Sequence, residues 1–159
     1  MNRKLISILL KLVVIFAFAG FILVGIGPVR WFAASIIRTE PQLADKELFA
    51  VLYVNAGFIP VYISLVLAWL VFDAIGSDRG FSYVNAKRLD IAAIMAIVDI
   101  VMVIIANMIF NSWNIGGPPT IMCTMGLTFL GLAAAIVCFS LARLVSEAAR
   151  LKQEVDLTI

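Results

Sequence analysis

The chain has 159 residues, of which 64% are hydrophobic and 14% charged, and its formal net charge is +2. Such an apolar composition is typical of a membrane protein, and so small a net charge gives no support for direct binding of nucleic acid. The sequence contains no histidine, so it lacks the commonest metal ligand and the usual general base near neutral pH. It also shows no recognisable nucleophile and base pair. We therefore expect a protein that is not an enzyme and holds no cofactor and no metal.

Four long apolar runs fill most of the chain, at residues 5–26, 48–72, 91–110 and 121–141. A helix needs about 20 residues to cross a bilayer core roughly 30 Å thick. The runs are too long and too continuous for the strands of a membrane barrel, which alternate over about 10 residues. The sequence predicts an all-α bundle of four transmembrane helices, forming one domain over residues 1–159 with a tail at residues 142–159.

Lysine and arginine are distributed unevenly between the segments that flank these runs. Three segments carry three basic residues each: Arg3, Lys4 and Lys11 at the start, Arg79, Lys87 and Arg88 in the middle connection, and Arg143, Arg150 and Lys152 in the tail. The first connection has Arg30, Arg38 and Lys46, but three acidic residues offset them. Because basic residues favour the cytoplasmic side of a membrane, both termini and the middle connection are expected there.

Four charged or amide side chains fall within the predicted spans and form a candidate intramembrane polar site: Asp99, Asn107, Asn55 and Lys11. Asp99 lies near the middle of the third span, where an ionisable group is costly and should face the bundle interior or a hydrated cavity. It could be a protonated structural group, an ion-pair partner of Lys11, or part of a proton or cation pathway. Asn55 and Asn107 should lie in the outer half, where they could form hydrogen bonds between helices.

The fourth predicted span is rich in small residues. Gly131 and Ala135 are four positions apart, a spacing that lets two helix backbones approach closely in a membrane. This pair could pack inside the bundle, or it could face a second copy of the chain in a homo-oligomer.

The middle connection contains a signal for the start of a helix. Ser82 can cap the free amides of a helix that begins at Tyr83, while Phe81 packs against its first turns. Lys87 and Arg88 would then lie at headgroup level, where basic side chains contact anionic lipids.

Two segments resemble a bacterial family of four-helix membrane proteins, Domain of Unknown Function 2975. The family pattern P-F-S-x-x-N-x-x-R-L is matched here by Phe81, Ser82, Asn85, Arg88 and Leu89, with Gly80 in place of the proline. The family ending L-K-E-E-x-D-L-T-I/V is matched here by Leu151, Lys152, Glu154, Asp156, Leu157, Thr158 and Ile159. The candidate cytoplasmic interaction site consists of Phe81, Ser82, Asn85, Arg88, Leu89, Leu151, Glu154, Asp156, Leu157, Thr158 and Ile159.

The family has no established activity, and its members often occur beside small helix-turn-helix regulators. The resemblance therefore implies a scaffold or sensor in the bacterial inner membrane that engages a cytoplasmic partner, with a transcription regulator as the candidate. The apolar residues of the tail, Leu151 and Val155 among them, could instead fold back onto residues 81–89. The alternative class of function is a small transporter or ion-coupled module that uses Asp99.

Overall fold

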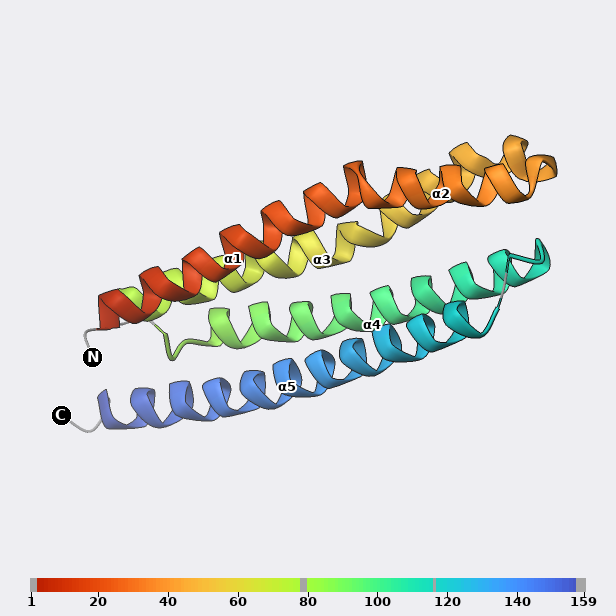
Figure 1. Cartoon of the computed structure of the whole chain (residues 1–159). Helices are drawn as coiled ribbons and strands as arrows, with labels where there is room; N and C mark the ends of the chain where they lie inside the picture. The colour runs from red at the N-terminus through yellow and green to blue at the C-terminus, as the bar shows by residue number, and fades with distance from the viewer. Residues whose placement is uncertain (1–2, 78–79, 116, 157–159) are drawn as a thin grey trace.

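The computed structural model describes residues 3–77, 80–115 and 117–156. Its elements are α1 (Arg3–Ile26), α2 (Pro28–Thr39), the short 3-10 helix η1 (Pro41–Lys46), α3 (Glu47–Gly76), α4 (Tyr83–Ser112) and α5 (Pro118–Asp156) (Figure 1). No strand occurs in these described ranges. Four residues singled out from the sequence lie outside the described residues: Arg79, Leu157, Thr158 and Ile159.

Four helical segments are long and apolar enough to cross a membrane, at Lys4–Thr39, Pro41–Gly76, Tyr83–Ser112 and Thr120–Val155. They contain the four apolar runs, so the predicted all-α fold with four spans is confirmed. In the first segment α2 follows α1 after a single residue. Pro28 occupies the first turn of α2, where its missing amide hydrogen costs nothing because first-turn amides have no partner within the helix.

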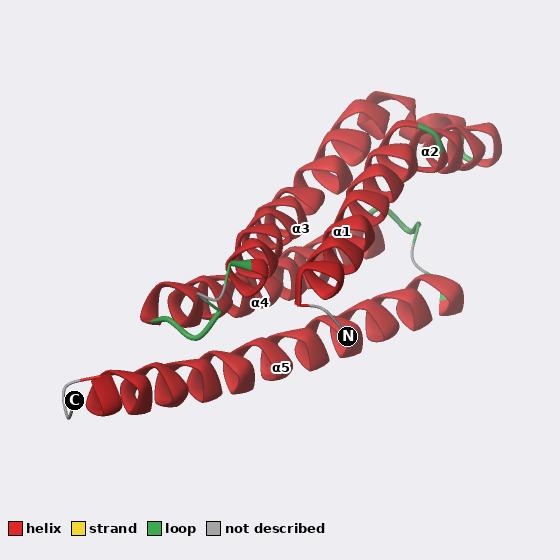
Figure 2. Ribbon diagram, turned by 90° about the vertical axis from the view of Figure 1, so that its left-hand side faces the viewer, coloured by secondary structure: helices red, strands yellow, loops and turns green. Residues whose placement is uncertain are grey.

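The four long helices lie in a row in the order α1, α3, α4 and α5 (Figure 1). Consecutive helices in this row pack against each other and run antiparallel. Over the described residues the backbone of α5 approaches only α4, and α1 approaches α3 but neither α4 nor α5. Figure 2 shows α5 along one edge of the assembly. Most large apolar side chains are consequently exposed on the protein, as expected where lipid supplies the apolar surroundings.

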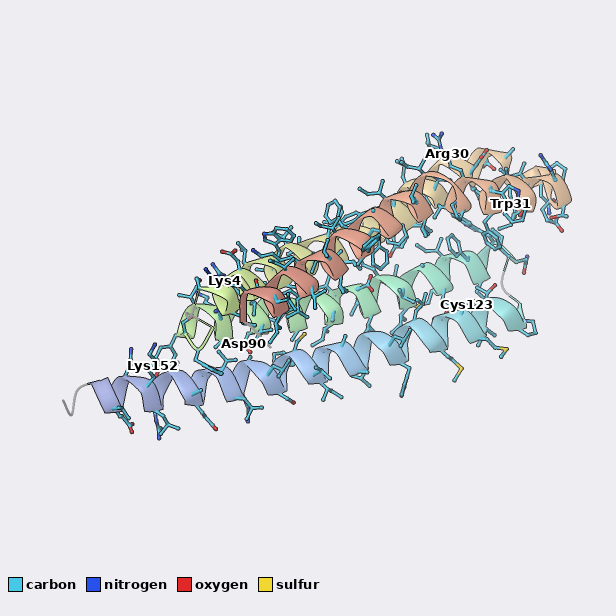
Figure 3. All side chains as sticks on the ribbon, turned by 60° about the vertical axis from the view of Figure 1, so that its left-hand side comes forward. Lys4, Arg30, Trp31, Asp90, Cys123 and Lys152 are labelled. Carbon is cyan, nitrogen blue, oxygen red and sulfur yellow. The ribbon has the colours of Figure 1, made fainter. Side chains whose placement is uncertain are left out.

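Both chain termini and the connection from α3 to α4 lie at the same end of the row, which we term the terminal end (Figure 1). Lys4 and Lys152 lie toward this end, whereas Arg30 and Trp31 lie toward the opposite one (Figure 3). The three basic segments are therefore on one side, as their charge pattern predicts. That this side faces the cytoplasm remains a prediction.

Small residues line the contact between α4 and α5. Ala135, Ala142 and Ala149 are all buried, and their spacing of seven keeps one side of α5 against a single neighbour. A methyl group at Gly131 would lie 2.7 Å from Cγ1 of Ile100 in α4, so this glycine permits the close approach. Gly131 and Ala135 thus pack inside the bundle. A homo-oligomer through α5 would have to use other faces of the helix, and it remains a prediction.

We expect that replacing Gly131 by leucine lowers the free energy of unfolding by about 1–3 kcal/mol, because the new side chain must displace Ile100. Gly126 is the matched control, since a methyl group there would meet no atom within 4 Å. Denaturant unfolding of the purified protein in detergent micelles measures both changes. Equal effects of leucine at the two positions would contradict the assigned packing of α4 on α5.

Candidate functional site at the terminal end

The start of α4 is built as its sequence indicates. Ser82 has an extended backbone and precedes Tyr83, the first helical residue. Its side-chain oxygen accepts a hydrogen bond from the backbone amide of Asn85 at 3.4 Å, and its carbonyl accepts from the amides of Asn85 and Ala86. The predicted cap at Ser82 is therefore confirmed.

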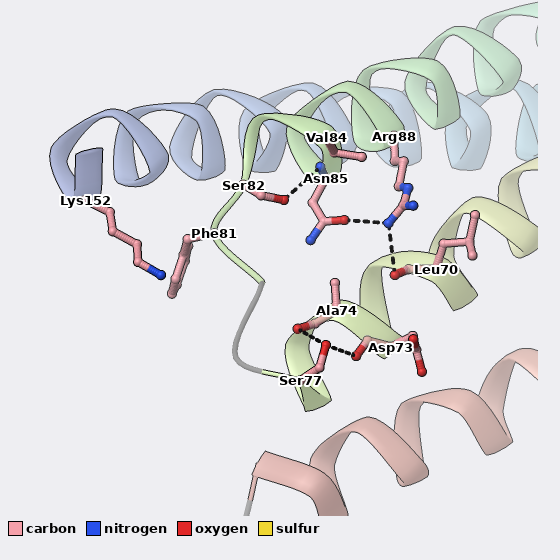
Figure 4. A pocket seen from close by; sticks show the side chains of 10 residues that line it. All are labelled: Leu70, Asp73, Ala74, Ser77, Phe81, Ser82, Val84, Asn85, Arg88 and Lys152. Carbon is pink, nitrogen blue, oxygen red and sulfur yellow. Dashed lines mark hydrogen bonds between the residues drawn. The ribbon is translucent and has the colours of Figure 1, made fainter. Parts of the chain in front are cut away.

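Asn85 and Arg88 join α4 to the end of α3 (Figure 4). The side-chain amide of Asn85, which is 1% exposed, donates a hydrogen bond to the carbonyl of Gly80 at 3.0 Å. Arg88 donates from Nη1 to Oδ1 of Asn85 at 2.8 Å and to the carbonyl of Leu70 at 3.3 Å. We term Ser82, Asn85 and Arg88 the polar clamp. A buried amide requires such partners, so the clamp holds the connection against both helices.

The polar clamp changes the interpretation of the candidate interaction residues in this segment. Asn85 is buried and bonded within the chain, so the expectation that it contacts a partner is wrong. Arg88 and Leu89 are half-buried, and Phe81 is exposed rather than packed on the first turns of α4. The spacing of three residues from Ser82 to Asn85 to Arg88 places them along one side of the helix. This spacing is the feature of the sequence from which a hydrogen-bond network within the chain could have been predicted.

A cavity of about 480 Å³ lies beside the polar clamp. Its wall is formed by Leu70, Asp73, Ala74, Ser77, Phe81, Ser82, Val84, Asn85, Arg88 and Lys152. All but one of these residues belong to α3, the connection or α4. Lys152 comes from α5 and reaches the cavity beside Phe81 (Figure 4). Sequence reasoning missed the cavity, because its wall depends on how α3 and α4 pack across their connection and includes one residue from α5.

Lys11 has a different partner from the one considered in the sequence. Its ammonium forms an ion pair with Asp73 of α3, and it lies 5.1 Å from the centre of the Trp69 ring. The interpretation that Lys11 pairs with Asp99 is wrong. Lys11 and Asp73 are both near the terminal end of antiparallel helices, whereas Asp99 is about 24 Å along α4 from its first residue.

The remaining three residues of the predicted intramembrane site also lie apart from one another. Asn107 donates from Nδ2 to Oγ1 of Thr124 at 2.7 Å, which confirms its predicted bond between helices. Asn55 instead donates to the carbonyl of Val51 in its own helix. Asp99 is half-buried and makes no hydrogen bond to any residue that the structure describes. The four candidate residues therefore do not meet in one intramembrane site, and Thr124 is a partner that sequence reasoning missed.

The tail continues α5 as a helix as far as Asp156. Leu151 and Val155 are 57% and 59% exposed, so neither is buried against residues 81–89, and the other apolar tail residues, Leu157 and Ile159, lie outside the described residues. Glu154 forms an ion pair with Arg150 one turn earlier, and both side chains are exposed. The helical pattern persists because each residue from 150 to 156 can continue a helix and none of them is glycine or proline.

This geometry defines a multi-span α-helical membrane protein with an ordered polar network at its terminal end. The chain belongs to the DUF2975 family, described as proteins of unknown function, whose family model matches residues 31–159. No curated protein and no solved structure matches the chain. The match includes the polar clamp, the cavity wall and the helical tail.

Proposed function

We propose that this protein is a non-enzymatic scaffold or sensor in the bacterial inner membrane, with its terminal end in the cytoplasm. The observation that carries the proposal is an exposed apolar stripe on the last turns of α5. Leu144, Leu151 and Val155 form this docking stripe, and they are 62%, 57% and 59% exposed.

The length of α5 supports this assignment. Its 39 residues correspond to about 58 Å of helix, against a bilayer core of about 30 Å. Figure 1 shows α5 running past the first turn of α4 at the terminal end. The helix is thus long enough to cross the membrane and to present several turns beyond it.

The direction of the docking stripe also supports a partner. Leu144 and Leu151 each follow a buried alanine by two residues, which places them about 200° around the helix from the surface that packs on α4. The intervals of seven and four residues along the stripe are those by which one helix packs against another. Full burial of each side chain would contribute about 1.5–3 kcal/mol.

The partner that fits this stripe is an amphipathic helix of a soluble cytoplasmic protein. The resemblance described above makes a small helix-turn-helix transcription regulator the candidate. The protein itself would hold the regulator at the membrane and would make no contact with DNA.

The alternative, an ion-coupled module built around Asp99, has less support. A transport pathway needs a chain of polar groups through the bundle. Lys11, Asn55 and Asn107 are instead bonded to other residues, and Asp99 stands apart from all three in the described part of the chain.

Replacing Leu151 and Val155 together by serine tests the proposal. We expect insertion into the membrane to be unchanged and recovery of the partner in pull-downs from native membranes to fall at least tenfold, because helix-binding grooves depend on a few apolar anchors. The control is Gln153→Ser, an exposed position between the two.

The proposal is supported if the control variant recovers a regulator with a helix-turn-helix domain in the pull-down and the double variant does not. Its direct binding would then be reproduced with the two purified proteins. Equal recovery by both variants, or loss of binding by the control as well, would rule out the stripe as the docking surface.

A further inference from the structure

A second cavity, of about 420 Å³, lies between α1 and α3, which run side by side (Figure 1). We term it the α1–α3 groove; its apolar wall includes Val14, Phe18 and Ile22 of α1 and Leu65, Val66 and Trp69 of α3. We propose that this groove binds an acyl chain of a phospholipid whose headgroup, a phosphate with a primary ammonium, lies on the Lys11–Asp73 ion pair. The proposal does not depend on a protein partner.

The surroundings of the α1–α3 groove favour a hydrocarbon occupant. Both sides of its wall belong to helical segments that are long and apolar enough to cross a membrane. No described residue of α4 or α5 contributes to the wall. Because the bilayer core contains no water, acyl chains fill such a space. Its volume lies within the range of about 300–1,000 Å³ typical of small-molecule sites, so it can hold a defined chain.

The Lys11–Asp73 ion pair lies at the terminal end of the groove. Lys11 is one turn before Val14 and Ile15 of the wall, on the same side of α1. Asp73 is one turn after Trp69, on the same side of α3. The Lys11 ammonium lies 5.1 Å from the centre of the Trp69 ring, which itself lines the groove. The headgroup of a lipid whose chain occupies the groove can therefore reach both charges.

The ion pair also lies at the depth of lipid headgroups. Lys11 is the last charged residue of α1, and the next charge along the chain is Arg30. Residues 12–29 correspond to about 27 Å of helix, close to the bilayer core of about 30 Å. In α3 no charged residue lies between Glu47 and Asp73. The pair thus marks the border of the apolar spans at the terminal end.

The two charges are complementary to a zwitterionic headgroup. The Lys11 ammonium has three N–H donors, and its bond to Oδ1 of Asp73 uses one, so it can also donate to a phosphate oxygen. The Asp73 side chain is 63% exposed, and its carboxylate can accept from the ammonium of the lipid. Phosphatidylethanolamine carries both groups. Phosphatidylcholine has no N–H donor, and phosphatidylglycerol has no cation to place against Asp73.

Native mass spectrometry of the full-length protein in detergent tests the headgroup, with phosphatidylethanolamine and phosphatidylcholine of identical acyl chains. We expect phosphatidylethanolamine to bind about tenfold more tightly, the difference expected for one charge-assisted hydrogen bond. Asp73→Asn should remove most of this preference, because the amide oxygen carries no charge, although it can still accept from Lys11. The control is Asp90→Asn, which removes the same charge from α4, outside the groove wall, and should keep the preference.

The variant Ala19→Phe tests the groove itself. Ala19 is an exposed residue of the wall, so a phenyl ring there would occupy the space of the acyl chain. We expect the binding of both lipids to weaken about tenfold. The matched control is Ala133→Phe, the same change at an exposed alanine of α5 outside the groove, which should leave binding unchanged.

The proposal is overturned if the native protein binds phosphatidylethanolamine and phosphatidylcholine equally. It is also overturned if Ala19→Phe and Ala133→Phe weaken binding to the same degree. Tighter binding of phosphatidylglycerol than of phosphatidylethanolamine would contradict the role assigned to Asp73. A dimer that Ala19→Phe dissociates would assign the groove to a second copy of the chain instead of a lipid.

Discussion

Replacing Asn85 by leucine is expected to lower the free energy of unfolding by about 2–3 kcal/mol. Asn85 is the largest fully buried side chain of the described protein, and its amide satisfies both the carbonyl of Gly80 and the guanidinium of Arg88. Leucine would leave these two groups without that partner, and one of them is charged. Equilibrium unfolding in detergent micelles measures the loss.

Hydrogen exchange of residues 80–90 should rise in the same variant, because the polar clamp holds this connection against α3 and α4. The matched control is Asn111→Leu, an exposed asparagine at the opposite end of α4. It should change neither the stability nor the exchange by a measurable amount. Unchanged exchange in Asn85→Leu would show that the clamp does not order the connection.

Replacing Asp99 by leucine is expected to raise the stability of the protein in a membrane by about 2–4 kcal/mol. Insertion scales place aspartate about 3 kcal/mol or more above leucine at the centre of a transmembrane helix. Asp99 makes no hydrogen bond to any described residue that would offset this cost. Unfolding of the protein reconstituted in lipid bicelles measures the difference, and Asp99→Asn should fall between the two.

The two variants at Asp99 also separate the remaining interpretations of this residue. A loss of stability in Asp99→Leu would restore the view that the carboxyl is a structural hydrogen-bonding group. If the native protein carries protons or cations into vesicles and a correctly folded Asp99→Asn variant does not, the ion-coupled function is better supported than the scaffold. We expect no such flux and unchanged partner binding in both variants.

Local features of the chain were predictable from the sequence because each depends on residues close together in it. The length and hydropathy of the apolar runs determine that four helices form and cross a membrane. The cap at Ser82 requires only a hydroxyl ahead of the first free amides of α4. The family resemblance likewise rests on short segments, and the match over residues 31–159 confirms it.

Which residues meet across helices was decided only by the tertiary structure. The spans are apolar on nearly every side, so the sequence carries little information about how each helix is rotated or which helix is its neighbour. The pairing of Lys11 with Asp73, the burial of Asn85 and the separation of Asp99 all follow from the depth and rotation of packed helices. The row order also brings Lys152 of α5 to the wall of the cavity that α3, the connection and α4 form.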